Sequence, residues 1–405
     1  TQKAKDYFEK LIEIDPNNIS LINGVLNFLE TFKFSDKIKN EKVDLKRLFL
    51  FLFRKNNINH SNLIRNAKLL LFLDDEPHLY ADFILKIINS KSILLENKEI
   101  KVLLKQELFH LMLQKSLIVD EFFEKLLIKL RRETLFTLIN NTKNTLKEYL
   151  DFINSLAEQC WLNEYLYIQS EKENEFIKKL KDKIENSKEV NELEIAILGC
   201  YVPLNSSKII INKLSNYESA NTLFDDLINV QIREPLREKE LIKSIKSLDI
   251  ISDPTSNKVR EQYEQNPYPR WRYTNMSLPN NFFRWINTEI KPNKIDYNKN
   301  FDKPNVLIAG GGTGKHTISA TKYENAEILA VDLSLTSLAY SKRKTDELGL
   351  KNIEYLQADI LQLKKLNRKF DIIECSGTLH HMKDPVAGLK VLSDILQPHG
   401  YLKLG

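Results

Sequence analysis

Glycine is scarce in the first 300 residues of this chain. Of the 11 glycines among 405 residues, only Gly24 and Gly199 precede residue 300. Glycine interrupts helices, and this stretch is instead rich in Leu, Ile, Lys, Glu and Asn. We therefore predict an all-α domain over residues 1–250, arranged as an irregular helical solenoid. A chain of this length has room for two or three domains.

Cysteine is also rare. Cys160, Cys200 and Cys375 are scattered, and no pair has a spacing suited to a metal site or a redox site. We expect three free thiols, no bound metal and a reducing compartment, which makes the cytoplasm the expected location.

Long apolar runs and targeting signals are missing as well. The runs Leu48–Phe53 and Leu69–Leu73 are far shorter than the stretch of about 20 apolar residues that spans a bilayer. We interpret both as core helix segments and expect no membrane partner. No signal peptide or lipidation motif is visible.

The chain has no concentrated basic surface in its sequence. Lys and Arg number 60 against 55 Asp and Glu, a net charge of +5 that is spread evenly. The basic run from Lys125 to Arg132 has Leu126, Leu127 and Leu130 at helical spacing, so we interpret it as a solvated helix face. No nucleic-acid partner is expected, because such a partner requires a basic patch.

Glycine returns in a motif near residue 310. The apolar run from Asn305 to Ala309 ends in Gly310-Gly311-Gly312-Thr313-Gly314, and a second apolar run ends in Asp332. The pattern predicts a strand, a glycine turn, a helix and a second strand with an acid at its tip. In a doubly wound sheet this arrangement binds a nucleoside-containing cofactor, with the acid on the ribose hydroxyls.

The loop narrows the choice of cofactor. A dinucleotide motif would need a third glycine where Lys315 stands, which disfavours NAD. A phosphate loop would need glycine at Ala309 and Ser or Thr at His316, which disfavours ATP. The Gly-x-Gly-x-Gly turn of S-adenosylmethionine (SAM) enzymes remains.

The elements that follow have the order of a known family. Strands are predicted over residues 352–360, 370–375 and 401–404, with a helix from Val386 to about Leu396. Together with the Leu-His-His and Leu-x-Pro-x-Gly motifs that begin at Leu379 and Leu396, this set resembles the class I SAM-dependent methyltransferases. The resemblance implies a Rossmann-like doubly wound α/β sheet over residues 304–405. The family core has seven strands, so we expect about five here and an incomplete C-terminus.

The resemblance also implies roles for single residues. Gly310, Gly312 and Gly314 would shape the turn under the methionine part of SAM. Asp332 would bind the ribose, and Asp359 would bind the adenine amine. Leu333 and Ile360 would pack beside the adenine. Two simpler interpretations stay open: Asp332 as a helix cap and Asp359 as part of a strand-end turn.

Two further positions bear on activity. Family members carry an acid where this chain has Ile308, and the acid helps to hold the SAM amino group. The missing acid indicates either a substitute group or weaker binding. His380 and His381 are candidate general bases, because an imidazole titrates near neutral pH. We select His380; the alternative is that both histidines only cap the turn and contact the cofactor.

Residues 251–303 form a connector rich in proline and aromatic residues. We expect no helix over residues 259–273, because Pro267 and Pro269 lie there. As a lid, the segment would place Tyr263 near the sulfonium and Arg270 or Arg272 against an anionic group, with Trp271 beside them. An interdomain brace is the alternative.

The start of the chain and the connector share one further resemblance. The step from Ala4 to Phe8, with Pro16 eight residues later, matches half of a tetratricopeptide repeat. The whole chain resembles bacterial proteins that join such repeats to a methyltransferase domain. Three functions are therefore open: a methyltransferase whose helical domain recruits a protein or peptide acceptor, one that acts on a small molecule, and a SAM-binding scaffold without catalysis.

Overall fold

A computed structural model describes residues 2–32, 42–72, 80–89, 94–140, 146–276 and 278–405. The chain divides into two compact units. The helical unit comprises Thr1–Arg233 and Trp271–Thr274, and the sheet unit comprises Glu234–Arg270 and Asn275–Gly405. The division thus lies before Glu234, whereas we predicted a domain boundary at about residue 250.

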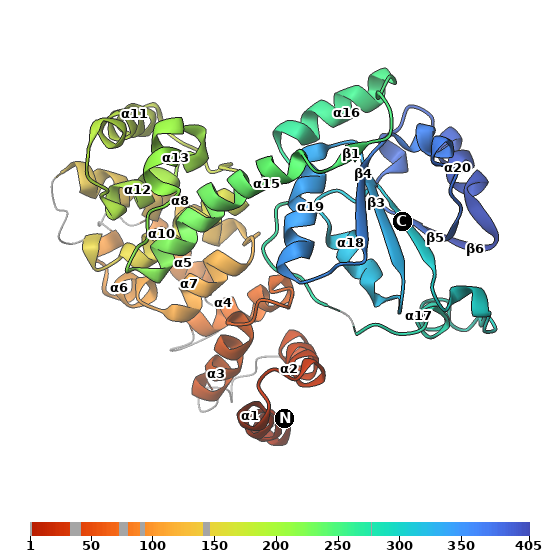
Figure 1. The fold of residues 1–405 in the computed structure, drawn as a ribbon. Helices are drawn as coiled ribbons and strands as arrows, with labels where there is room; N and C mark the ends of the chain where they lie inside the picture. Colours follow the sequence, from red (N-terminus) through yellow and green to blue (C-terminus); the bar gives the residue numbers. More distant parts are fainter. Residues whose placement is uncertain (1, 33–41, 73–79, 90–93, 141–145, 277) are drawn as a thin grey trace. The chain divides into compact units, whose positions relative to one another are not determined.

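The helical unit contains helices and no β-strand among its described residues (Figure 1). Its α-helices are α1 (Gln2–Ile14), α2 (Ile19–Thr31), α3 (Lys42–Phe53), α4 (Ile64–Phe72), α5 (Tyr80–Asn89), α6 (Lys98–Leu104), α7 (Glu107–Lys115), α8 (Glu121–Ile139), α10 (Leu150–Leu162), α11 (Glu171–Asn186), α12 (Glu192–Gly199), α13 (Lys208–Leu214) and α14 (Thr222–Ile228). A π-helical turn, Asn229–Arg233, ends the first segment of the unit. The prediction of a helical N-terminal region is confirmed.

Core helices account for the short apolar runs. Leu48, Phe49, Leu52 and Phe53 of α3 are almost fully buried, so the interpretation of that run as core is confirmed. The run at residues 69–73 lies in α4, except that Leu73 is outside the described residues. No helix among the described residues has both the length and the apolar character that a membrane crossing requires.

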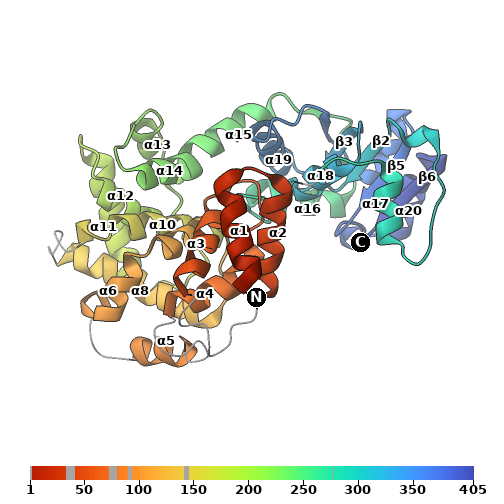
Figure 2. The same ribbon diagram turned by 90° about the horizontal axis from the view of Figure 1, so that it is seen from below.

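The first two helices pack as a pair. The rings of Phe8 in α1 and Phe28 in α2 lie 5.5 Å apart, and Gly24 leaves room for Phe8 against the second helix (Figure 2). Asn18 begins α2 by accepting a hydrogen bond from the Leu21 amide. A helix pair is therefore present where half of a repeat was predicted. That the helical unit is a tetratricopeptide or solenoid array stays a prediction.

The sheet unit is built on a six-stranded sheet whose strands pair in parallel in the order β1-β4-β3-β2-β5-β6. Its strands are β1 (Lys246–Ser247), β2 (Asn305–Ala309), β3 (Glu327–Asp332), β4 (Ile353–Gln357), β5 (Phe370–Cys375) and β6 (Leu396–Leu404). Its helices are α15 (Glu234–Ile242), α16 (Pro254–Gln265), α17 (Phe282–Glu289), α18 (Lys315–Ser319), α19 (Leu335–Glu347) and α20 (Pro385–Asp394). The predicted Rossmann-like fold is confirmed.

Helices cover both faces of this sheet (Figure 1). On one face, Val306 and Ile308 pack with Phe282 of α17, and α15 and α19 continue the layer. On the other face, Leu307 and Ala309 pack with Leu392 of α20. Because both faces are buried, the central strands consist of nearly continuous apolar residues, as parallel sheets require.

The sheet differs from the prediction in two strands. We expected about five strands, and the count of five was wrong because β1 consists of only Lys246 and Ser247, which carry no hydrophobic pattern. Strand β6 begins at Leu396, not at Tyr401, because Leu396 already pairs with Phe370. The pairing of β5 with β6 has a register shift between Phe370 and Ile372.

The connector also differs from the prediction. Helix α16 continues through residues 259–265, where we expected none. A proline inside a helix removes a backbone donor and clashes with the preceding turn, and the residue before a proline avoids helical geometry. Helix α16 accordingly ends at Gln265, one residue before the Asn266-Pro267 step. The two prolines therefore mark the end of the helix and do not prevent it.

Candidate active site

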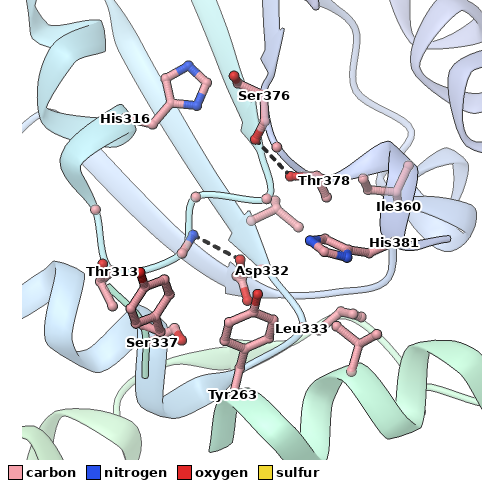
Figure 3. A pocket seen from close by; sticks show the side chains of 18 of the residues that line it. Tyr263, Thr313, His316, Asp332, Leu333, Ser337, Ile360, Ser376, Thr378 and His381 are labelled. Atoms are coloured by element: carbon pink, nitrogen blue, oxygen red, sulfur yellow. Dashed lines mark hydrogen bonds between the residues drawn. The ribbon is translucent and has the colours of Figure 1, made fainter. Parts of the chain in front are cut away.

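A pocket of about 380 Å³ lies at the carboxyl ends of β2, β3, β4 and β5. Strand β2 is the point where the chain order in the sheet reverses, since β3 lies on one side of it and β5 on the other. Ligands of doubly wound sheets bind at this switch point. Figure 3 shows the side chains that surround the pocket.

The glycine turn forms one wall of the pocket. Gly310, Gly312 and Gly314 all line it, and all three have positive φ angles. A Cβ at Gly310 would lie 2.0 Å from the Thr378 hydroxyl, so glycine is required there for packing. A Cβ at Gly312 would meet nothing within 4 Å. The space beside Gly312 is thus open to a ligand.

Asp332 ends β3 beside this turn. Its carboxylate accepts hydrogen bonds from the Gly312 amide (2.9 Å) and from the Ser334 amide (3.0 Å). Burial raises the pKa of Asp332, although the backbone donors oppose the shift. The cap of α19 is Ser334, whose side chain accepts from the Ser337 amide. The structure therefore gives the helix-cap role to Ser334 and leaves Asp332 on the pocket wall.

The other predicted cofactor residues also line the pocket, namely Leu333, Asp359 and Ile360. Asp359 follows β4 and accepts a hydrogen bond from the Leu361 amide (2.9 Å), which caps the 3-10 turn Ile360–Leu366. Asp359 therefore both caps this turn, as the simpler interpretation has it, and lines the pocket. All seven predicted cofactor-binding residues meet at one cavity.

Helix α16 supplies a side of the pocket that the prediction did not give to a helix. Tyr263 lines the pocket and points toward Asp332 (Figure 3). The next residue, Glu264, fixes the helix: its carboxylate accepts from the amides of Leu335 (2.7 Å) and Thr336 (3.1 Å) at the start of α19. A carboxylate at a helix N-terminus is favoured by the helix dipole. Glu264 was not predicted, because its partners lie some 70 residues away in the chain.

The remaining connector residues divide between the two units. The Thr313 hydroxyl donates to the Pro269 carbonyl (2.8 Å), so Pro269 is held at the glycine turn. Arg270 is not among the described residues that line the pocket. Trp271 and Arg272 belong to the helical unit, where Trp271 is buried.

Arg272 has carboxylate partners of its own. It donates to Asp226 (2.8 and 3.0 Å) and to the buried Glu158 within the helical unit. Burial opposes its charge, but Glu158 and Asp226 outweigh that effect and raise its pKa. Arg272 therefore has its anionic partners within the protein, which favours the brace over the lid for this residue.

The two candidate bases occupy different places. Both histidines are exposed, but His381 lines the pocket, whereas His380, which we selected, is not among the described lining residues. Both lie in the 3-10 turn Leu379–His381. Successive residues of such a turn point in directions about 120° apart, and of these two it is His381 that lines the cavity.

His316 is a further pocket residue, which we considered only as a mismatch to a phosphate loop. It lies in α18 directly after the glycine turn, and its Nε2 lies 2.6 Å from Oε2 of Glu374 in β5. The register pairs Glu374 with Ile308, so both point to the same face of the sheet. A buried carboxylate thus lies one strand away from the position where the acid is missing.

The pocket fits a nucleoside that carries an amino-acid moiety. A half-buried carboxylate, Asp332, stands at the tip of β3, and the apolar side chains of Leu333 and Ile360 line the same pocket. At the other end, open space adjoins Gly312, and Lys315 and His316 follow the glycine turn. These residues suit the ribose, the adenine and the amino-acid chain of SAM.

Comparison with known proteins gives the same class. Residues 306–400 match the family model described as a methyltransferase domain. An uncharacterized protein of Synechococcus sp. is 30% identical over 156 residues, which are 38% of this chain and 37% of that protein. The demethylmenaquinone methyltransferase of Staphylococcus saprophyticus is 32% identical over 93 residues, 22% of this chain and 39% of the relative.

Two further likenesses complete the comparison. The ubiquinone biosynthesis O-methyltransferase of Acinetobacter baumannii is 26% identical over 98 residues, 24% of this chain and 41% of the relative. Among solved structures, PKMT2 from Rickettsia typhi in complex with AdoHcy matches 25% of this chain and 20% of that chain at 30% identity, with a TM-score of 0.24. The chain spans about two fifths of the length of the curated relatives named here.

Residues 306–400 are therefore a methyltransferase domain. The pocket of this domain fits S-adenosylmethionine as its cofactor.

Proposed function

We propose that the protein transfers a methyl group from SAM to an acceptor that enters at the Gly310 end of the pocket. The observation that carries the proposal is the meeting of Asp332, Asp359 and the glycine turn at one cavity within the matched methyltransferase domain. Bound SAM supplies the methyl group and its own leaving group, so the protein has to align the reactants and exclude water.

The residues divide this work between them. Asp332 accepts hydrogen bonds from the ribose hydroxyls, and Asp359 accepts from the adenine amine. Leu333 and Ile360 contact the adenine, and the open space at Gly312 admits the amino-acid chain. Tyr263, held by Glu264 and α16, covers the ribose side and excludes water. We propose that a histidine of the pocket wall has the catalytic role, in place of His380, which we selected from the sequence.

The acceptor is a protein or a small molecule. Strand β5 runs into Ser376 and Gly377 and lacks the Asn/Asp-Pro-Pro-Tyr/Phe motif that many enzymes use to methylate planar nitrogens, which supports an acceptor of another kind. Two relatives have names that place them in quinone biosynthesis, which supports a small molecule. We propose that the helical unit recruits the acceptor or a partner; exposed apolar side chains at Val119, Leu166 and Ile168 support this role.

Calorimetry and labelling test the proposal together. The full chain should bind S-adenosylhomocysteine, the demethylated product of SAM, but neither NAD nor ATP with Mg²⁺. Asp332→Ala should weaken binding about tenfold or more, because two buried hydroxyl donors lose their acceptor at about 1 to 3 kcal/mol each. Ser393→Ala, on the surface of α20 and away from the pocket, is the control.

The labelling arm asks whether catalysis occurs. Incubation of the full chain with a cell extract and SAM labelled in its methyl group should place label in protein or in small molecules, and mass spectrometry identifies which. Binding of S-adenosylhomocysteine without any transfer would favour a SAM-binding scaffold, the alternative that Ile308 raises. Binding of ATP without SAM would contradict the cofactor assignment itself.

A further inference from the structure

A histidine and a carboxylate form a pair at the edge of the pocket. His316 Nε2 and Glu374 Oε2 lie 2.6 Å apart, and Glu374 is 2% exposed. Three more groups face this carboxylate or its neighbours: the Tyr323 hydroxyl donates to Glu374, Lys322 Nζ lies 3.6 Å from it, and Lys322 also lies 3.6 Å from Glu289. The pair is thus set in a fixed polar network.

This network keeps Glu374 ionised. Burial opposes the charge, but His316, Lys322 and Tyr323 outweigh it and lower the pKa of Glu374 to about 2. An ionised carboxylate only accepts hydrogen bonds, so the imidazole nitrogen that faces it carries the proton. The neutral ring of His316 is therefore the Nε2–H tautomer, with the lone pair on Nδ1.

The second ring nitrogen of His316, Nδ1, is not engaged by a carboxylate in the described part of the chain. Among the described residues, Nδ1 has no hydrogen-bond partner, and the side chain is 23% exposed. His316 lines the main pocket and also an adjoining cavity of about 370 Å³ that contains Glu374, Ser319 and Lys403. Gly310 and Ser376 are shared by the two cavities as well.

The position of His316 in the main pocket separates it from the nucleoside residues. Figure 3 shows His316 and Ser376 at the end of the pocket away from Tyr263 and Leu333. If the nucleoside lies at Asp332, the reacting methyl group and the acceptor lie toward His316. A carboxylate that orients an imidazole and holds its tautomer is the arrangement by which proteins make histidine a general base.

We propose that His316, positioned by Glu374, is the general base of this protein and that its acceptor is a weakly acidic hydroxyl, phenolic or enolic, bound in the adjoining cavity. This inference rests on the proposed methyl transfer. The acceptor O–H gives its proton to Nδ1 of His316, and the oxygen electron pair forms the new bond to the methyl carbon. The electron pair of the broken carbon–sulfur bond stays on sulfur, and His316 releases the proton to water.

The histidines of the 3-10 turn are weaker candidates for this role. Neither His380 nor His381 has a carboxylate within hydrogen-bond distance among the described residues; their rings contact each other, 4.1 Å apart. Without a carboxylate, nothing in the structure selects one tautomer. His316 is the pocket histidine whose proton position the protein determines.

The same sheet unit offers a matched control. His399 Nε2 lies 2.9 Å from Oδ1 of Asp371, which is near the opposite end of β5 from Glu374. This pair has the same chemistry but lines neither cavity. Its ring packs against Phe301. Any effect of histidine–carboxylate pairing on stability alone should therefore appear in both pairs.

Nuclear magnetic resonance tests the pair without an acceptor. In the full chain labelled with ¹⁵N-histidine, long-range ¹H–¹⁵N spectra should show His316 as the Nε2–H tautomer with an unprotonated Nδ1 near neutral pH. His316→Asn assigns the signal. Saturation with S-adenosylhomocysteine should shift the Nδ1 signal of His316 and leave that of His399 in place. Glu374→Gln should abolish the tautomer preference. A charged ring or an Nδ1–H tautomer at His316 would overturn the proposal.

Transfer kinetics provide the second arm. His316→Asn should lower label transfer from SAM by about 10²-fold or more, with the affinity for S-adenosylhomocysteine changed by less than about threefold. His399→Asn should leave both unchanged. The methyl group should be found on oxygen. If His316→Asn weakens binding of S-adenosylhomocysteine and leaves transfer at saturation intact, His316 is a cofactor ligand and the proposal is wrong. If the unaltered chain transfers nothing, the proposed function fails, and the tautomer measurement still decides the pair.

Discussion

At the scale of single residues, burial controls how Asp332 behaves. Its carboxylate pKa is raised by burial, so the folded protein binds a proton at Asp332 more tightly than the unfolded chain does. The ionised carboxylate therefore costs stability at neutral pH, and this cost is relieved as the pH falls below the raised pKa. A residue that is retained at such a cost fits a binding role better than a structural one.

This burial predicts a pH dependence of cofactor binding. A protonated carboxyl accepts fewer hydrogen bonds than a carboxylate, so the affinity for S-adenosylhomocysteine should fall with decreasing pH. The fall should begin above the range of an ordinary aspartate, which is about pH 4. Calorimetry across the acid range measures it. Asp332→Asn should give weak binding that is flat with pH over this range, and a wild-type affinity that did not change with pH would contradict the assignment of Asp332.

The residue scale also shows what the sequence could and could not predict. Local spacing in the sequence was enough to predict the roles of Gly310, Gly312, Gly314 and Asp332. The partners of His316 and Glu264 lie 58 and about 70 residues away. Only the fold brings such pairs together, so His316 appeared in the sequence as a defect in a phosphate loop.

At the scale of elements, local sequence patterns predicted the central strands of the sheet. They did not predict the edge strand β1 or the unit to which helix α15 belongs. Strands β2, β3 and β5 are apolar runs that are long enough to be recognised. Strand β1 has two residues and exists only because Lys246 and Ser247 pair with Leu356 and Gln357. Helix α15 precedes it and was assigned to the helical domain, since its sequence gives no sign of which unit it packs against.

Helix α15 is held in the sheet unit by a buried charge. Arg343 of α19 is 4% exposed and contacts Glu234 (3.0 Å) and Glu238 (2.8 Å) of α15. Burial opposes the charge of Arg343, but these glutamates raise its pKa. Arg343→Met leaves Glu238 buried without this partner, and the loss of one member of a buried pair costs about 3 to 5 kcal/mol.

Thermal unfolding with and without S-adenosylhomocysteine provides the measurement. In thermal unfolding, the transition that S-adenosylhomocysteine moves upward reports the sheet unit. We expect Arg343→Met to lower its midpoint strongly. Arg368→Met is the control, because Arg368 pairs with Glu354 at the surface (3.3 Å), where such pairs contribute about 0 to 1 kcal/mol. Equal effects of the two changes would show that α15 is not anchored by Arg343.

At the scale of the whole molecule, the chain crosses between the units three times. It leaves the helical unit at Arg233, returns to it for Trp271–Thr274, and then completes the sheet unit from Asn275. The lid and brace interpretations of the connector therefore apply to different residues: Tyr263 lines the pocket of the sheet unit, whereas Trp271 and Arg272 belong to the helical unit. The sequence could not separate them, because proline, arginine and aromatic residues are common to both kinds of segment.

The returning segment gives a prediction for each interpretation. Arg272→Met leaves Glu158, which is fully buried, without its guanidinium partner, so the helical unit should lose about 3 to 5 kcal/mol of stability. Two unfolding transitions should then separate, and S-adenosylhomocysteine should still raise the one that reports the sheet unit. Tyr263→Ala should do the reverse, weakening cofactor binding or methyl transfer with little change in the helical unit. A loss of cofactor affinity in Arg272→Met, at a temperature where the helical unit remains folded, would contradict this division and assign the whole connector to the site.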